Sequence, residues 1–456
     1  MKRVLLLSFI CIFSLTGAVA QKGIAASMKR LMNDKIFTEG DASVVIYDLT
    51  AGESLFKHRS RKVVRPASVM KVLTTVVALD TLGFEHTMKT TLSESAAEGG
   101  YNLYVRGEMD PLFGEQDMID MAAAVPAGSV VDTLYADCSF SDSIYWGPGW
   151  SWDDNPYAYQ PYLSPLMLCG GAVEVVVTPS DEGCPPEYTC TPESSFYTVV
   201  NEAECGNPDI GKLTILRDWL VDSNVIRISG NCTKVSKEEL NMYKSADFFL
   251  AVLVEKLDSM GVEVKNVAFG KTPQHANPIH IASRPILDVV EEALLESNNL
   301  CAEALLYHVA ASVSSAPASM ERGCKVVRAF VKEKLGYESG YNISDGSGLS
   351  LYNYVTADMF MSLLRYLYSN PDMYSIVYER LPLSGVKGTL KNRTKGTAAY
   401  KKVRAKTGTV KAVSTLVGYA TGKNGHTYAF VLLNNGNMRS RDMRVWQDKV
   451  LEAICR

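Results

Sequence analysis

The sequence predicts an α/β (α+β) fold in which both ends of the chain build one domain and a β-rich region is inserted between them. Residues 43–58 have the alternation of a β-hairpin, and residues 404–436 read as three successive strands. Helices are expected at 65–82, 286–295 and 299–312. A chain of 456 residues is long enough for about two or three domains.

The first residues have the features of a cleaved secretory signal. Two basic residues precede an apolar run that ends in Ala18-Val19-Ala20, a cleavage site of the A-x-A type. The sequence therefore predicts a signal peptide over 1–20 and an exported, periplasmic mature chain. A transmembrane anchor is disfavoured, because the run is marginal for the roughly 20 apolar residues of a span and Gly17 interrupts it.

The elements of the terminal domain follow from local signals. The hairpin breaks at the turn T-A-G-E, and the segment after it, R-P-A-S-V-M-K-V-L-T-T-V-V-A-L-D-T-L, reads as a mostly apolar helix. Near the other end, Asn424-Gly425 marks a tight turn between two of the three expected strands. An amphipathic segment over 442–456 is expected to close the chain as a helix.

The middle of the chain differs in composition from both ends. It holds short β-like runs and many turn residues, and residues 141–165 combine four prolines, three tryptophans and four tyrosines without periodicity. Such a segment is expected to be a shaped loop. We therefore expect a catalytic domain over 21–90 and 281–456, and an inserted region over 91–280.

Export makes the cysteines interpretable. Six of them cluster in the inserted region, at 138, 169, 184, 190, 205 and 232. Their irregular spacing indicates structural disulfide bridges, although six cysteines allow 15 pairings and the sequence does not choose among them. A zinc site is the alternative, but the chain has no C-x-x-C, no neighbouring histidine pair and no H-E-x-x-H. No metal and no cofactor is therefore expected.

The overall composition is that of a globular protein, with 47% hydrophobic and 21% charged residues. The formal net charge is −4, and no run of lysine and arginine is long enough to follow a phosphate backbone. Nucleic acid is therefore not an expected partner.

The motif S-x-x-K occurs three times, at Ser54–Lys57, Ser68–Lys71 and Ser384–Lys387. The first pair lies in an expected strand, where side chains three apart point to opposite faces, and the third lies in a glycine-containing loop. Only Ser68 starts an expected helix, which puts Lys71 on the same face one turn later. Taken alone, Ser68 is more simply a helix cap and Lys71 a solvated charge.

A catalytic serine–lysine pair would need further groups from elsewhere in the chain. Serine needs an adjacent base, and lysine acts as that base only when desolvation or a second cation lowers its pKa. Lys406-Thr407-Gly408 is the only K-T-G of the chain, at the start of an expected strand. Ser297-Asn298-Asn299 joins two expected helices. Each motif alone is also explained by a strand start or a helix junction.

Together, Ser68-x-x-Lys71, Ser297-x-Asn299 and Lys406-Thr407-Gly408 resemble, in kind and order, the motifs of penicillin-binding proteins and serine β-lactamases. Longer segments resemble the penicillin-binding protein 4 type of D-alanyl-D-alanine carboxypeptidase/endopeptidase, of low molecular mass and class C. These segments are PASVMKVLTT, GEMDPLF, GPGWSWDDNPYAY, SNNLCAEALL, DGSGLS, LPLSGVKGTLKNR and VRAKTGTVKAVSTLVGY. The second motif reads S-N-N where S-D-N is common, and GEMDP stands where relatives often have GGGDP.

The resemblance implies a penicillin-recognising, β-lactamase/transpeptidase-like domain with an antiparallel sheet flanked by helices. It implies that Ser68 attacks the carbonyl between two terminal D-alanines of a peptidoglycan stem peptide and that Lys71 takes its proton. Ser297 and Lys406 would pass a proton to the leaving amine. Asn299 would hydrogen-bond the substrate amide, and Lys406 and Thr407, beside Gly408, would hold the terminal carboxylate. The backbone N–H groups of Ser68 and Thr409 would bind the oxyanion. The loop with Trp150, Asp153 and Tyr157 would shape the pocket for the stem's side chain.

The resemblance also implies the partners. Peptidoglycan stem peptides would be the substrates and β-lactams the covalent inhibitors, and a homodimer is left open. The alternatives are a serine β-lactamase or S-x-x-K esterase, and a catalytically silent peptidoglycan-binding or penicillin-sensing protein. A Ser-His-Asp hydrolase is disfavoured, because the chain has no G-x-S-x-G.

Overall fold

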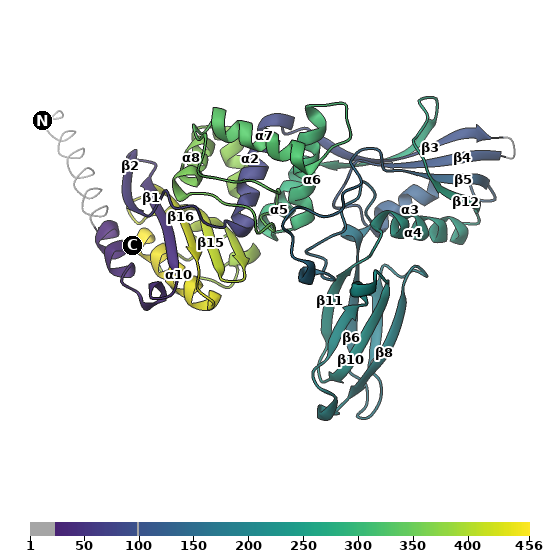
Figure 1. Ribbon diagram of the computed structural model, residues 1–456, viewed down its shortest axis with the longest axis horizontal. Helices are drawn as coiled ribbons and strands as arrows, with labels where there is room; N and C mark the ends of the chain where they lie inside the picture. Colours follow the sequence, from purple (N-terminus) through teal and green to yellow (C-terminus); the bar gives the residue numbers. More distant parts are fainter. Residues whose placement is uncertain (1–22, 98–99) are drawn as a thin grey trace, which may run out of the picture. The chain divides into compact units, whose positions relative to one another are not determined.

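The computed structural model describes residues 23–97 and 100–456 (Figure 1). The signal peptide predicted over 1–20 lies outside these residues. The chain divides into two compact units. The first comprises the residues up to Thr81 together with Val290–Asn298 and Cys324–Arg456, and the second comprises Leu82–Val289 and Asn299–Gly323.

The first unit is built from both ends of the chain. Its strands are β1 (Asp41–Asp48), β2 (Glu53–His58), β14 (Val403–Val410), β15 (Val413–Thr421) and β16 (Thr427–Asn435). Its helices are 23–31, α2 (Met70–Leu82), α8 (Ala357–Tyr368), α9 (Pro371–Arg380) and α10 (Ser440–Cys455), with the 3₁₀ turns η1 (Lys35–Phe37), η2 (Ala67–Val69) and η7 (Gly388–Leu390). The division between the units falls within α5 (Ile286–Leu295) and α7 (Met320–Glu333).

The sheet of the first unit has the order β14-β15-β16-β1-β2, and all of its strands pair antiparallel. Helix α10 packs on β15 and β16, and α8 packs on β16 and β1 (Figure 1). The alternation of side chains between the two faces of β15 and β16 explains this layering. Phe430 shares a core with Trp446 of α10, whereas Tyr419 of β15 donates a hydrogen bond to the Leu364 carbonyl of α8 on the other side. An antiparallel sheet covered by helices on both faces is therefore confirmed.

The second unit contains the inserted region. Its larger sheet comprises β3 (Thr87–Ala97), β4 (Gly100–Gly107), β5 (Val130–Asp137), β12 (Glu263–Phe269) and β13 (Asn277–Pro285). Its smaller sheets comprise β6 (Ala172–Thr178), β7 (Glu187–Thr191), β8 (Thr198–Cys205), β9 (Thr214–Arg217), β10 (Val225–Cys232) and β11 (Ser236–Asn241). Its helices are α3 (Glu115–Ala123), α4 (Ser245–Ser259) and α6 (Asn299–Ser312), with the 3₁₀ turns η3 (Trp152–Asp154), η4 (Cys169–Gly171), η5 (Pro208–Ile210) and η6 (Trp219–Val221).

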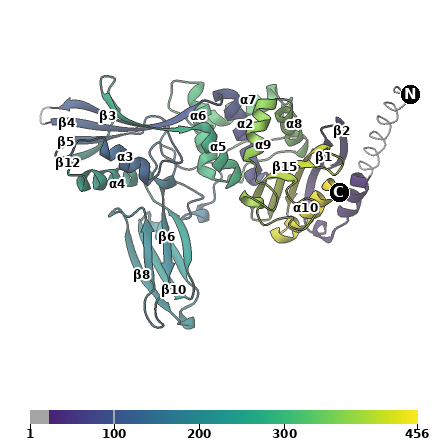
Figure 2. The same ribbon diagram turned by 180° about the vertical axis from the view of Figure 1, so that it is seen from behind.

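The larger sheet of this unit has the order β12-β5-β4-β3-β13, with α3 and α4 packed together along it (Figure 2). The smaller sheets, β8-β10-β9 and β11-β6-β7, share one apolar core with it. Domain limits predicted at 90/91 and 280/281 cut through β3 and β13. These two strands pair with each other, so both belong whole to the second unit.

Several local predictions can be compared with the structure. The helices expected at 286–295 and 299–312 are confirmed as α5 and α6, and the closing helix is confirmed as α10. The disulfide bridges expected among the six clustered cysteines of the inserted region are absent, because these six are thiols. Cys205 and Cys232 pair in register on β8 and β10, and both thiols are buried and pack as small apolar groups in the second core.

Across residues 23–97 and 100–456, no helix combines the length and the apolar character that a membrane crossing requires.

Candidate active site

Ser68 and Lys71 lie at the entrance to α2. The predicted helix over 65–82 begins with the 3₁₀ turn η2, and Ser68 is in that turn rather than in the first α-helical turn. The residue before it, Ala67, has a left-handed backbone with φ +48°. The Lys71 side chain is fully buried, and its Nζ lies 3.0 Å from Ser68 Oγ. A buried amine is therefore held within hydrogen-bond distance of a half-buried hydroxyl.

The loop 345–350 holds Lys71 in place. Lys71 Nζ donates a hydrogen bond of 2.9 Å to the Ser347 carbonyl. The loop is fixed from within by the buried Asp345 carboxylate, which accepts from the Gly348 N–H at 2.8 Å and from the Ser350 N–H at 2.6 Å. Gly348 has φ +84°, and a Cβ there would lie 2.0 Å from the Ala67 carbonyl oxygen. Only glycine fits at this position.

Ser297 and Lys406 form a second hydroxyl–amine pair. Ser297 follows α5 with a left-handed backbone, φ +67°. The fully buried Lys406, on β14, donates 2.7 Å to Ser297 Oγ and 2.9 Å to the Thr407 carbonyl. Burial lowers the pKa of Lys406 well below its usual value, and the charge of Lys71 lowers it further, against a small opposing effect of Glu296. Two lysines this close in a dry site disfavour each other's charge.

Strand β14 passes directly beside η2. A Cβ on Gly408 would lie 2.9 Å from the Ser68 backbone nitrogen and 2.3 Å from Thr415 Oγ1. Thr415 Oγ1 in turn donates 2.6 Å to the Pro66 carbonyl, just before Ser68. The glycine of the K-T-G motif therefore lets the strand approach the serine's own N–H.

One cavity of about 300 Å³ joins these groups. Its lining carries hydroxyls and two guanidinium groups: Ser68, Ser297, Thr389, Arg393, Thr407, Thr409, Ser414, Thr415 and Arg444. Thr407 Oγ1 donates 2.8 Å to Thr389 Oγ1. The structure therefore brings together Ser68, Lys71, Ser297, Lys406, Thr407, Gly408 and Thr409 within the first unit.

The sequence-based prediction missed several residues of this site, among them Ser347, Arg393, Arg444 and the hydroxyl-bearing residues Thr389, Ser414 and Thr415. Ser347 acts through its carbonyl, which no side-chain pattern reveals, although its segment was among those that resemble the family. Arg393 likewise lies in such a segment. Arg444 has no local signal, because an exposed arginine is ordinary on an amphipathic helix.

The other two S-x-x-K pairs are not assembled. Ser54 is exposed on β2, and Lys57 forms an ion pair of 2.9 Å with Asp358. Ser384 is buried and donates 2.7 Å to the Ala399 carbonyl, while Lys387 donates to the Glu379 carbonyl.

Two predicted site residues belong to the second unit. Asn299 is the first residue of α6, and its Nδ2 donates 2.7 Å to the Tyr159 carbonyl. Asp153 is exposed in η3, in the loop where Trp150 is buried and Tyr157 stacks on Tyr159.

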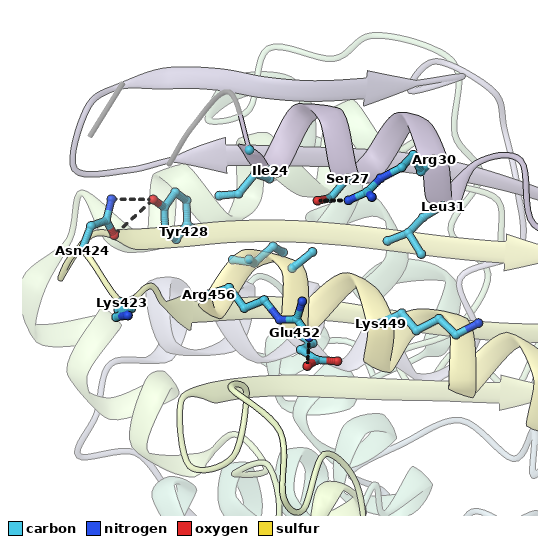
Figure 3. A pocket seen from close by; sticks show the side chains of 13 residues that line it. Ile24, Ser27, Arg30, Leu31, Lys423, Asn424, Tyr428, Lys449, Glu452 and Arg456 are labelled. Carbon is cyan, nitrogen blue, oxygen red and sulfur yellow. Dashed lines mark hydrogen bonds and ion pairs between the residues drawn. The ribbon is translucent and has the colours of Figure 1, made fainter. Parts of the chain in front are cut away.

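A larger cavity of about 780 Å³ lies elsewhere in the first unit, between the helix at 23–31 and the end of α10 (Figure 3). Several of its polar side chains are engaged with one another: Arg456 with Glu452, Arg30 with Ser27, and Asn424 with Tyr428. It contains no serine–lysine pair among its lining residues, and we assign no chemistry to it. Among the residues that the structure describes, no cluster of three or more His, Cys, Asp or Glu could hold a metal ion.

Comparisons with known proteins agree with this geometry. Residues 24–453 match the D-Ala-D-Ala carboxypeptidase 3 (S13) family. A D-alanyl-D-alanine carboxypeptidase of an Actinomadura species is 31% identical over 89% of this chain and 80% of its own length.

Solved structures show the same fold. The crystal structure of penicillin binding protein 4 from Haemophilus influenzae superposes with a TM-score of 0.78 at 21% identity, covering 91% of this chain and 95% of that one. The same protein complexed with a β-lactam gives a TM-score of 0.72 at 20% identity, covering 90% and 95%. The chain belongs to the D-Ala-D-Ala carboxypeptidase 3 (S13) family and is a serine-type D-Ala-D-Ala carboxypeptidase with the penicillin-recognising fold.

Proposed function

We propose that this carboxypeptidase works through an acyl-enzyme on Ser68, with Lys71 as the base. Ser68 Oγ attacks the carbonyl carbon between the two terminal D-alanines of a stem peptide, and its proton passes to Lys71 Nζ, 3.0 Å away. Burial of Lys71 and the proximity of Lys406 both favour a neutral amine, which a base requires. The observation that carries the proposal is the buried Lys71 amine beside the half-buried Ser68 hydroxyl at the wall of a cavity.

The proton on the leaving amine is supplied from the second pair. Collapse of the tetrahedral intermediate breaks the C–N bond, and the departing nitrogen takes a proton from Ser297 Oγ, which Lys406 replenishes across 2.7 Å. The lowered pKa of Lys406 means that its ammonium form gives up a proton more readily than an exposed lysine does. Water then attacks the ester carbonyl and releases the shortened peptide and Ser68.

The backbone N–H groups of Ser68 and Thr409 are proposed to bind the oxyanion. Their preorganisation relies on the close approach of β14 at Gly408. The hydroxyl groups of Thr407 and Thr409 face the cavity and are proposed to hold the substrate's terminal carboxylate, with the charge of Lys406 behind them.

The second unit is proposed to supply substrate contacts. Asn299 follows Ser297 by two residues, so their Cα atoms are at most about 7 Å apart, and we assign its amide to the substrate backbone. Asp153, with Trp150 and Tyr157, is assigned to the stem's side chain. We assign catalysis to the first unit and substrate recognition to the insertion between its first two motifs.

The remaining proposals concern setting and inhibitors. β-Lactams are expected to acylate Ser68 and to leave slowly, as analogues of the terminal dipeptide; the related structure with a bound β-lactam supports this. The predicted signal peptide supports an exported, periplasmic enzyme that acts on peptidoglycan stem peptides. A homodimer stays a prediction.

The test uses the mature protein and its Ser68→Ala variant, each incubated with a labelled penicillin and with a stem pentapeptide. We expect a covalent adduct and released D-alanine from the wild type and neither from the variant. Absence of both products from the wild type would rule out the proposed acyl-enzyme mechanism. Rapid penicillin hydrolysis without peptide cleavage would indicate a β-lactamase, and an adduct that persists in the variant would exclude Ser68 as nucleophile.

A further inference from the structure

The cavity beside Ser68 carries more positive charge than the three motifs explain. Besides its hydroxyl groups, it is lined by Arg393 and Arg444, which come from the loop after η7 and from α10. No carboxylate is among its lining residues. Such a lining favours an anion with several acceptor atoms.

Arg393 is already neutralised within the fold. Its guanidinium lies 2.7 Å from the Asp448 carboxylate, and it also donates to the Arg444 carbonyl and to Gln447 Oε1. These contacts tie the loop to α10. Arg393 therefore acts as a structural support for the cavity wall.

Arg444, unlike Arg393, has a guanidinium that no carboxylate of the described residues neutralises. Its side chain is exposed at the cavity and makes no hydrogen bond or ion pair with any residue that the structure describes. Its position is nevertheless defined by the helix. Gln447, one turn later on the same face, donates 3.0 Å to the Ser414 carbonyl, and so fixes this turn of α10 against β15.

The register of the sheet places the threonines on that same side. Thr409 and Ser414 are paired residues of β14 and β15, so their side chains share one face, and Thr407 points the same way two residues before Thr409. All three line the cavity with Arg444. A carboxylate held by these hydroxyl groups therefore has one uncommitted guanidinium available to it.

We propose that Arg444 is a specificity-determining residue that binds the free α-carboxylate of the leaving residue. This inference rests on the proposed function, in which the carboxylate lies at Thr407 and Thr409. Arg444 supplies a bidentate cation that recognises a free carboxyl terminus and disfavours an amidated or extended one. Lys406 is buried and its amine is hydrogen-bonded to Ser297, so we assign Lys406 to the proton transfer.

The test compares two peptides that differ only at the terminus, a stem-peptide analogue ending in D-Ala-D-Ala acid and the same peptide ending in the amide. Arg444→Ala is expected to lower kcat/KM for the acid by about 10-fold to 100-fold, chiefly through KM, and to change the value for the amide by less than about 2-fold. Arg444→Lys is expected to regain part of the loss. Lys449→Ala, which removes an exposed charge from the same helix, is the matched control.

A second pair of compounds keeps the test decisive if the peptide amide is cleaved too slowly to measure. The rate of acylation by a penicillin and by its methyl ester should fall in Arg444→Ala only for the free acid. Equal losses for acid and neutral partner, or no loss for either, would overturn the role of Arg444 while leaving Ser68-dependent cleavage intact. Failure of the wild type to release D-alanine or to form an adduct would overturn the proposed function, and this inference with it.

Discussion

At the scale of single residues, the unusual feature is the complete burial of two lysines, Lys71 and Lys406. A buried ammonium is costly unless it loses its proton or finds strong partners. Lys71 Nζ donates to Ser68 Oγ and to the Ser347 carbonyl, and Lys406 Nζ donates to Ser297 Oγ and to the Thr407 carbonyl. Burial disfavours the charged form of an amine, and Lys71 must be neutral to act as the base for Ser68.

The first prediction tests this base. Lys71→Ala is expected to slow acylation of Ser68 by labelled penicillin by about 100-fold to 10,000-fold, the range of general-base contributions. The control is Lys57→Ala, the lysine of an unassembled S-x-x-K, whose exposed ion pair is worth little. A Lys71→Ala protein that is acylated at the wild-type rate would contradict the assignment.

At the same scale, the sequence was informative for the residue types but not for their environment. Ser68, Lys71 and the K-T-G motif could be named from local patterns and from the resemblance. The burial of Lys71 and its bond to Ser347 depend on a loop 276 residues away in the chain. A pattern of side chains carries no signal for a backbone carbonyl.

At the scale of elements, the site depends on how closely β14 lies against η2. Gly408→Ala would force a Cβ to within 2.9 Å of the Ser68 nitrogen and 2.3 Å of Thr415 Oγ1. The second prediction is that this change lowers the acylation rate by about 100-fold, as expected when catalytic atoms shift by about 1 Å.

The matched control is Gly23→Ala, where an added Cβ meets nothing within 4 Å. It should leave the acylation rate unchanged. An active Gly408→Ala variant would show that the strand can move away from Ser68 without loss.

Helix α6 carries a buried imidazole that makes the second unit sensitive to acid. His308 Nε2 lies 2.6 Å from the Glu108 carbonyl and Nδ1 lies 2.9 Å from His86 Nε2, and Phe140 packs on the ring. Burial lowers the pKa of His308 from 6.5 to about 3, with a further contribution from His86, whose own pKa is lowered by burial. These contacts explain why α6 belongs to the second unit.

The third prediction follows from the sign of this shift. Between pH 6.5 and about 3 the unfolded chain binds more protons at this site than the folded one, so folding stability falls as the pH falls. The Tm of His308→Gln should therefore fall less than the Tm of the wild type between about pH 7 and about pH 4, which spans most of the range between the two pKa values.

The comparison with the wild type cancels other groups, such as Glu108, whose raised pKa acts in the opposite direction. The exposed His275→Gln serves as the control and should follow the wild type. Parallel Tm profiles of wild type and His308→Gln would contradict the prediction.

At the scale of the whole molecule, the two units have separate apolar cores. Phe249 belongs to the core of the second unit and Phe430 to that of the sheet in the first unit. Truncation of either buried ring to alanine should cost roughly 3–5 kcal/mol of stability. The fourth prediction is that both variants lower the Tm, but that only Phe430→Ala slows penicillin acylation at 25 °C.

The measurement combines thermal unfolding with the acylation rate of the folded protein. A Phe249→Ala protein that is folded at 25 °C yet is not acylated would show that the core of the second unit supports the chemistry directly.

The sequence by itself determined the elements and the motifs. Amphipathic and alternating patterns located α5, α6, α10 and the three strands β14, β15 and β16, the first of which carries the K-T-G motif. They did so because these patterns reflect which side of an element is buried. Tertiary structure alone decided the environment: the free thiols of the inserted region, the burial of Lys71 and Lys406, and the side of the cavity on which Arg444 lies. These depend on groups that are distant in the chain and meet only in the folded molecule, which no local pattern encodes.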